Sequence, residues 1–144
     1  MLFLPQRPYL PLGTLREALL YPQAAGGIDD ARLAAVLDQV GLPALASRLG
    51  DGENWAASLS IGEQQRLAFG RILLARPAMV FLDEATAALD EEAEAELYRT
   101  LRAAPWHPTV VSVGHRSTIR PFHDKVAEIA RFAARRPSLV PAAD

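Results

Sequence analysis

"VFLDEATAALD", residues 80–90, is the stretch of the sequence that decides the fold class. It opens with an uninterrupted apolar run, which is typical of a strand buried on both faces of a parallel sheet. The run ends in Asp83 and Glu84, and ligands of open parallel sheets bind beyond the carboxyl ends of the strands. Asp83 is therefore a candidate ligand of Mg²⁺, and Glu84 is a candidate base for a water that attacks a phosphate. The alternative is that the two acids merely end a strand.

Two further apolar runs are expected to be strands, and each is followed by a polar side chain. Residues 109–113, "TVVSV", precede Gly114 and His115, and the short run "MLFL" stops at Pro5 just before Gln6. His115 should lie at the same sheet edge as Glu84, where an imidazole can donate to a phosphate oxygen. Gln6 can contact Mg²⁺ or the attacking water. The alternatives are a surface or capping histidine and an ordinary loop glutamine.

The stretch "LSIGEQQR", residues 59–66, reads as the start of a helix that runs from Ser60 to about residue 75. The first N–H groups of a helix lack intrahelical partners, and the helix dipole makes that end a ready anion site. Gly62 removes the side chain that would block a phosphate oxygen, and Ser60 can accept from the Glu63 N–H while donating outward. The alternative is a plain capping box of Ser60 and Glu63, which leaves Gly62 unexplained.

The remaining elements complete an α/β pattern, with a helical block inserted between the first and second strands. A short helix should begin at Thr14, and an amphipathic helix should run from Asp29 or Asp30 to Gly41. A helical piece is expected at 44–49, a loop at 50–58, a helix at 91–103 capped by Asp90, and a weak strand at 125–130. The tail, residues 135–144, is expected to be disordered.

Composition limits the classes of function that the chain can have. Its 144 residues suggest one domain or part of one, and half of them are hydrophobic, which is enough for a core. A net charge of −2 gives no support for a nucleic-acid partner, and the absence of cysteine excludes disulfides and thiolate metal sites. No segment approaches the ~18 apolar residues of a membrane helix. We expect a cytoplasmic location, or the cytoplasmic face of the inner membrane when the chain is attached to a membrane domain.

The order of these motifs over residues 2–126 resembles the ATP-binding cassette (ABC) family of ATPases. The resemblance makes Gln6 the Q-loop residue, Glu84 the catalytic glutamate and His115 the switch histidine, with Asp90 in the D-loop. It implies that ATP and Mg²⁺ are cofactors and that Asp83 and Gln6 bind the metal. Ile61 stands where the family usually has a second glycine, and Ala87 where a serine is common. The signature motif comprises Leu59, Ser60, Ile61, Gly62, Glu63 and Gln64.

The finer resemblance lies in residues 4–22, "LPQRPYLPLGTLREALLYP". This stretch is similar to cassettes fused to exporter-type membrane domains, in the branch that contains peroxisomal fatty-acyl transporters and bacterial uptake relatives for vitamin B12 or peptides. It implies a surface that meets the coupling helices of a transmembrane domain.

No G-x-x-x-x-G-K-[ST] phosphate-binding loop occurs in the sequence. The chain therefore resembles the C-terminal part of a cassette: a P-loop NTPase-like parallel sheet with a helical subdomain, truncated at the N-terminus so that the Walker A strand and loop are missing. The expected division is 1–134 for this part, with 7–75 as the helical subdomain and 78–130 as the remaining core. A misplaced start, a pseudogene remnant and a functional short protein all fit this pattern.

Three consequences follow from the resemblance. The strand at 109–113 should have an unpaired apolar edge, which predicts marginal stability of the isolated chain. ATP and Mg²⁺ should bind only together with a complete cassette, as a head-to-tail dimer. The chain alone should have no ATPase activity.

Rival functions are a non-enzymatic module that regulates an intact ABC ATPase and a fragment of an ABC ATPase without transport. The short insertion of residues 7–58 favours transport over the latter. An unrelated α/β domain would require all the motifs to align in order by chance.

Overall fold

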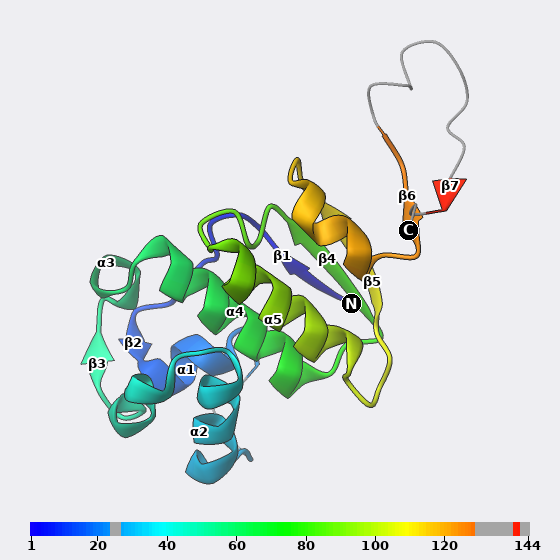
Figure 1. The fold of residues 1–144 in the computed structure, drawn as a ribbon. Coiled ribbons are helices and arrows are strands. Elements are labelled where there is room, and N and C mark those ends of the chain that lie inside the picture. The colour runs from blue at the N-terminus through cyan, green and yellow to red at the C-terminus, as the bar shows by residue number, and fades with distance from the viewer. Residues whose placement is uncertain (24–26, 129–139, 142–144) are drawn as a thin grey trace.

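Three parallel strands form the central sheet of the computed structural model, which describes residues 1–23, 27–128 and 140–141. The strands are β1 (Leu2–Leu4), β4 (Met79–Asp83) and β5 (Thr109–Val113), in the order β1-β4-β5 (Figure 1). The register pairs Leu4 with Leu82 and Asp83 with Val113. The expected parallel α/β class, with a helical block between the first and second strands, is confirmed.

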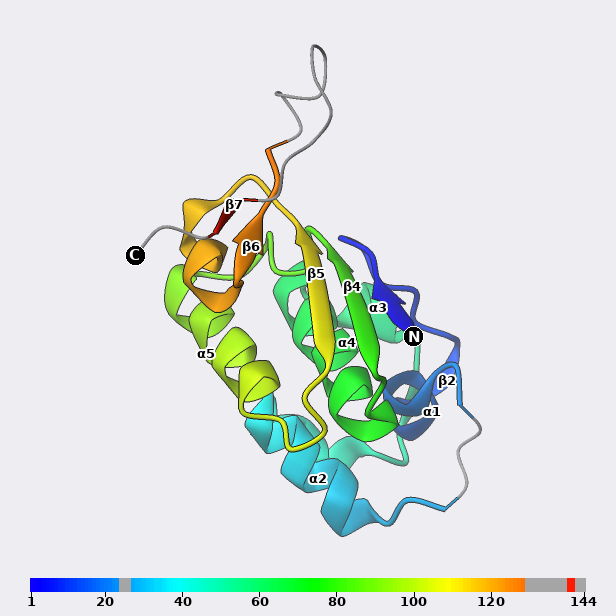
Figure 2. The same cartoon turned by 90° about the vertical axis from the view of Figure 1, so that its right-hand side faces the viewer.

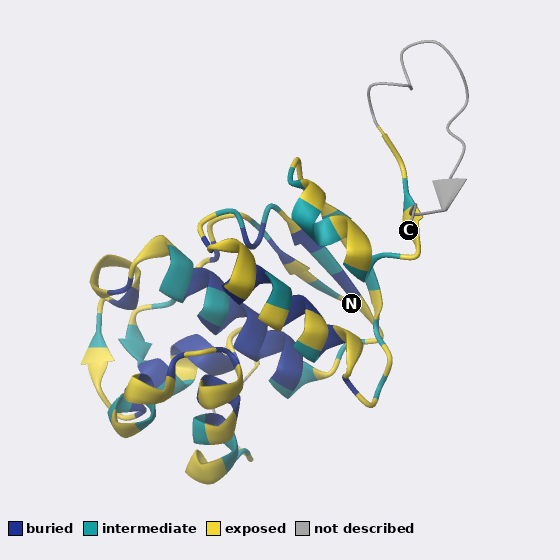
Figure 3. Cartoon of the chain, viewed as in Figure 1, coloured by how far each residue is buried: buried dark blue, intermediate teal, exposed yellow. Residues whose placement is uncertain are grey.

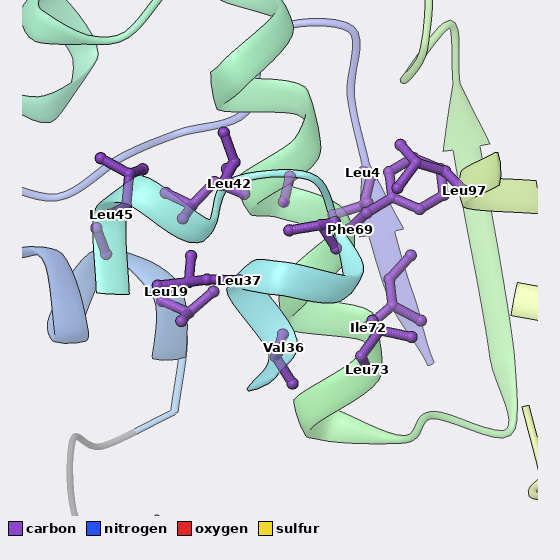
Figure 4. Close-up of a cluster of buried hydrophobic side chains, with 14 of the residues drawn as sticks. Leu4, Leu19, Val36, Leu37, Leu42, Leu45, Phe69, Ile72, Leu73 and Leu97 are labelled. Carbon is purple, nitrogen blue, oxygen red and sulfur yellow. The ribbon is translucent and has the colours of Figure 1, made fainter. Parts of the chain in front are cut away.

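Two long helices cover one face of this sheet. They are α4 (Ile61–Ala75) and α5 (Glu91–Arg102), and both lie along the same side of the strands (Figure 2). Val80 and Leu82 of β4 point into the core that these helices close. Leu4, Phe69, Ile72 and Leu97 meet there, so strands and helices share one apolar cluster (Figure 4).

The opposite face of the sheet is largely exposed, which corrects the expectation that β4 and β5 are buried on both faces. Phe3, Met79, Val111 and Val113 are exposed, and Phe81 is half-buried. Successive strand side chains point to opposite faces, and the helices α4 and α5 lie on one face alone. In the described part of the chain β5 is one of the two edge strands of this sheet, and its expected open edge is present.

The helical block packs on the far side of α4. It contains α1 (Leu15–Leu20), α2 (Asp30–Gln39) and the 3-10 helix η1 (Pro43–Arg48). Thr14 forms a capping box with Glu17, and the Asp29 side chain caps α2 by accepting from the Arg32 N–H. Figure 3 shows buried residues concentrated along α4, where this block and the sheet meet. The apolar stripe of α2 is buried, as the 3.6-residue period predicts. It consists of Leu33, Val36, Leu37 and Val40.

The segment predicted as a loop, residues 50–58, contains two short elements instead. β3 (Gly52–Glu53) pairs antiparallel with β2 (Gly13–Thr14), and α3 (Trp55–Ser58) follows. Trp55 is fully buried, and its indole N–H donates to the Gly13 carbonyl at 3.1 Å. This contact, 42 residues apart along the chain, organises a segment whose local composition is that of a loop.

The end of the chain departs from the expected core strand at 125–130. After the 3-10 helix η2 (Ser117–Phe122), β6 (Lys125–Val126) pairs antiparallel with β7 (Val140–Pro141), not with the central sheet. Residues 129–130, and the expected disordered tail apart from 140–141, lie outside the described residues. Among the helices that the structure describes, none is long and apolar enough to cross a membrane.

Candidate functional site

Glu84 and His115 meet at the carboxyl ends of β4 and β5. The His115 Nδ1 lies 3.2 Å from the Glu84 Oε1, within hydrogen-bond distance. The Glu84 side chain is 33% exposed and that of His115 is 73% exposed, so both remain accessible from solvent. The Glu84 backbone has φ +48, in the left-handed region, and its N–H donates to the Val113 carbonyl at 2.9 Å. The sheet thus brings together the two residues that the sequence placed at one edge.

A small pocket beneath this pair contains a buried carboxylate that the sequence did not indicate. Glu94 of α5 is 1% exposed and accepts from the hydroxyl groups of Thr86, at 2.6 Å, and Thr118, at 2.5 Å. Tyr98 also lines the pocket; its hydroxyl lies 2.9 Å from the Ser112 hydroxyl, and burial raises the pKa of Tyr98. Glu94 therefore ties the turn after β4 to the turn that follows His115.

Asp83 and Gln6 lie at the same sheet edge, since each follows or ends a strand of the parallel set. Both are exposed. No group of three or more His, Asp or Glu side chains in the described residues could hold a metal by itself. The donor set nevertheless fits Mg²⁺, which binds through one or two carboxylates, water and substrate phosphates. Asp83 would supply the carboxylate and Gln6 an amide oxygen.

A groove lies at the start of α4, beside the turn that joins β4 to α5. Ser60 caps α4: its Oγ accepts from the Glu63 N–H at 3.3 Å. Its hydroxyl donates to Glu63 Oε2 at 2.7 Å, which corrects the expectation that this proton points outward. Asp90, on the opposite wall, caps α5 by accepting from the Ala93 N–H at 2.8 Å. The lining residues are Gly41, Leu42, Ser60, Ile61, Gly62, Glu63, Arg66, Ala88, Leu89 and Asp90.

Gly62 has a structural reason to be glycine besides access for an anion. A Cβ at this position would lie 3.3 Å from Leu89 Cδ2 and 3.4 Å from the Ala88 carbonyl oxygen. The missing side chain lets the start of α4 approach the turn closely. A larger residue at position 62 would therefore press on this turn as well as on the groove.

Leu59 and Gln64 do not line the groove, although both belong to the predicted signature motif. Leu59 is buried in the core, and Gln64 is buried with its side-chain amide donating to the carbonyls of Ala56 (3.0 Å) and Leu59 (2.9 Å). These residues hold the turn between α3 and α4. They place the helix start rather than presenting groups to a ligand.

Gln65 and Arg116 were missed by the sequence analysis. Gln65 donates through Nε2 to the Gln6 carbonyl at 2.8 Å and accepts from the Ala88 N–H at 3.0 Å. Arg116 donates to the carbonyls of Leu89 and Ala87, each at 2.8 Å. The available signal was a polar residue at position 65 on the buried face of α4, where the helical period predicts an apolar one.

Comparison with solved structures gives the class of this domain. A bacterial Atm1-family ABC exporter with ATP bound matches with a TM-score of 0.72 and 32% identity, over 88% of this chain and 23% of that one. The parallel sheet, with the helical block inserted after its first strand, is thus the fold of an ABC ATPase.

Comparison with sequences gives the family. The ABC transporter family profile matches residues 3–87, more than half of the chain. An ABC transporter ATP-binding protein of Synechocystis sp. is 51% identical over 90% of this chain, and the lysosomal cobalamin transporter ABCD4 of Mus musculus is 42% identical over 90%. The chain belongs to the ABC transporter family and is part of an ATP-binding domain of that family. It spans about a fifth of these relatives, 20% and 23% of their lengths.

Proposed function

We propose that residues 1–134 supply part of the ATP-hydrolysing domain of an ABC transporter. In this proposal residues 7–75 form the helical subdomain and 78–130 belong to the core, apart from β6, which pairs with β7 outside the central sheet. The observation that carries it is the Glu84–His115 pair, 3.2 Å apart at the carboxyl edge of a parallel sheet. That edge is where open α/β sheets bind their ligands.

In the proposed reaction Glu84 is the base and accepts a proton from the water that attacks the γ-phosphate. His115 lies beside it and orients the phosphate oxygen and the water. Asp83 and Gln6 would hold Mg²⁺, which when bound neutralises charge on the phosphate oxygens. The exposure of Glu84 and His115 leaves room for substrate above the pair.

The groove at the start of α4 is proposed to bind the phosphates of a nucleotide held by a second, complete cassette in a head-to-tail dimer. The free N–H groups of the first helical turn, at Ile61 and Gly62, and the positive end of the helix dipole favour an anion there. Arg66 adds a positive charge to the lining, while Glu63 holds the Ser60 hydroxyl in place. Asp90 faces this groove from the D-loop side.

A second partner is proposed at residues 4–22, where the coupling helices of a transmembrane domain would dock. Tyr9, Leu12 and Tyr21 are exposed on this stretch. The rings of Tyr9 and Tyr21 pack edge to face, with their centroids 5.2 Å apart. Arg71 of α4 anchors the surface from below by donating to the carbonyls of Tyr9, at 2.8 Å, and Ala18. The chain would thus work at the cytoplasmic face of a membrane.

ATP turnover tests the proposal. The isolated chain should not hydrolyse ATP, because its sequence has no phosphate-binding loop. Mixed with a complete ABC ATPase domain from one of the relatives above, it should change the turnover of that domain. Ser60→Arg should abolish the change by filling the groove, whereas Ser58→Ala, outside the groove, should not.

Glu84-dependent turnover by the isolated chain would overturn the proposal that it is inactive alone. Binding to the complete domain with no change in turnover would favour the rival function, a non-enzymatic interaction module. The exposed apolar face of the sheet is the feature that supports such a module.

A further inference from the structure

Backbone groups of three successive residues in the turn between β4 and α5, Ala87, Ala88 and Leu89, are held by two side chains from different elements. The Ala88 N–H donates to the Gln65 Oε1 at 3.0 Å. The Ala87 and Leu89 carbonyls each accept from the Arg116 guanidinium at 2.8 Å. One side chain comes from α4 and the other from the segment directly after His115.

The same two side chains connect this turn to the rest of the candidate site. Gln65 is 1% exposed, and its side-chain amide nitrogen donates to the Gln6 carbonyl at 2.8 Å, 59 residues away along the chain. Arg116 is the immediate neighbour of His115. The turn is therefore bonded to the Gln6 loop, to the helix that carries Ser60, and to the segment that carries His115.

These hydrogen bonds fix the conformation of the turn, because neither the Gln65 amide nor the Arg116 guanidinium can make them in another orientation. A buried amide that makes bonds from both its oxygen and its nitrogen has one orientation, and breaking either bond leaves a buried polar group unsatisfied. The planar guanidinium holds its two carbonyl partners at a fixed separation, which the point charge of a lysine cannot do. Gly62 permits the close approach on which the Gln65 bond depends, since a Cβ there would contact Ala88 and Leu89.

We propose that Gln65 and Arg116 are positioning residues that clamp residues 87–89 and thereby hold the Glu84–His115 pair and the Ser60 groove in one relative geometry. Neither residue is assigned a contact with ATP. Their effect on catalysis rests on the proposed function, whereas the clamp itself is a property of this chain alone. Loss of the clamp should lower kcat with little change in KM, because it misplaces catalytic groups without removing a substrate contact.

The first test measures amide hydrogen exchange at Ala88 by NMR in the 144-residue chain, without nucleotide or partner. Gln65→Met keeps the side-chain size but removes both bonds, so exchange at Ala88 should be faster by about tenfold or more. Gln65→Glu keeps the acceptor for Ala88 and loses the donor to Gln6, so Ala88 should stay protected while the Gln6 loop loosens. Unchanged exchange at Ala88 in Gln65→Met would overturn the clamp.

Arg116→Lys provides a second route in case the buried substitutions unfold the chain, since Arg116 is only half-buried. Lysine can reach only one of the two carbonyls, so Ala88 exchange should rise and the His115 ring signal should shift at fixed pH. Arg99→Gln, which replaces an exposed arginine on α5, is the matched control and should change neither. If Arg116→Lys changed Ala88 amide exchange and the His115 ring signal no more than Arg99→Gln does, the proposal would be contradicted.

The second test measures ATP turnover with the complete ABC ATPase domain added. Arg116→Lys should lower the contribution of the chain to kcat by about tenfold, with KM for ATP within about twofold. Faster exchange with an unchanged kcat would overturn the positioning role. If the wild-type chain has no effect on turnover, the proposed function fails, and the exchange experiment still decides whether the clamp exists.

Discussion

Arg71 shows how one residue can hold a surface in place from beneath. It is 6% exposed on α4 and donates three hydrogen bonds, two to the Ala18 carbonyl and one to the Tyr9 carbonyl. Burial lowers the pKa of Arg71 to about 10, which still leaves the guanidinium charged at neutral pH. The three bonds offset part of the cost of burying the charge.

Replacing Arg71 by methionine should lower the free energy of unfolding by about 2–3 kcal/mol, because the Ala18 and Tyr9 carbonyls lose their donors. Arg71→Lys should recover part of the loss, since lysine keeps the charge but not the fork of donors. Urea unfolding with an unchanged m-value would measure the difference. Equal midpoints for the wild type and Arg71→Met would show that the bonds contribute nothing.

At the scale of single residues, the sequence predicted the candidate catalytic and metal-binding residues. It did not predict the residues that hold the site together through contacts with distant parts of the chain. Asp83, Glu84 and His115 follow apolar runs, so their place at the sheet edge could be read from the chain itself. Gln65 binds groups 23 and 59 residues away, which no local pattern encodes. The direction of the Ser60 hydroxyl could not be predicted from the capping-box pattern, because the Glu63 carboxylate accepts from that hydroxyl as well as from the Ser60 N–H.

At the scale of secondary-structure elements, the long helices could be predicted from the sequence, whereas the elements of two to four residues could not. The helix of residues 61–75 and the helix of residues 91–102 have several turns of periodic pattern and side-chain caps, so the bounds of both could be predicted to within a residue or two. β3 has two residues and α3 has four, too few for a periodic signal. Both β3 and α3 depend on Trp55, which is buried. The Arg48 guanidinium lies over its ring, 4.8 Å from the ring centroid.

Trp55→Phe should therefore test how the β2–β3 ladder is anchored. Phenylalanine keeps most of the buried ring but loses the bond to the Gly13 carbonyl, so the loss of stability should be about 1 kcal/mol. Trp55→Ala should cost about 3–5 kcal/mol, because it leaves a cavity. Thermal unfolding would measure both values. A larger loss in Trp55→Phe than in Trp55→Ala would contradict this account.

At the scale of the whole molecule, the sheet presents an apolar face that the described residues leave open. Phe3, Phe81 and Val111 lie side by side across the three strands, in register, and Val113 and Met79 extend the patch. Exposed apolar patches of this kind mark interaction sites or promote aggregation. The sequence predicted the open edge of β5 but not the open face, because a continuous apolar run does not reveal which layer is present to cover it.

Val111→Lys should raise the monomeric fraction of the isolated chain in sedimentation velocity experiments, since it places a charge in the middle of the open face. The free energy of unfolding should change by less than about 0.5 kcal/mol, because Val111 is exposed. Val80→Lys, on the buried face of β4, is the control and should prevent folding. A wild-type chain that stays monomeric at every concentration would contradict the prediction.

The left-handed backbone at Glu84 has a consequence for anyone who redesigns this protein. Glycine and asparagine occupy that conformation at less cost than glutamate does. A procedure that scores variants by melting temperature alone would thus select against the carboxylate and favour a sturdier domain without its proposed base. Screens for stabilised variants should hold position 84 fixed, since heat resistance and chemistry make opposite demands on it.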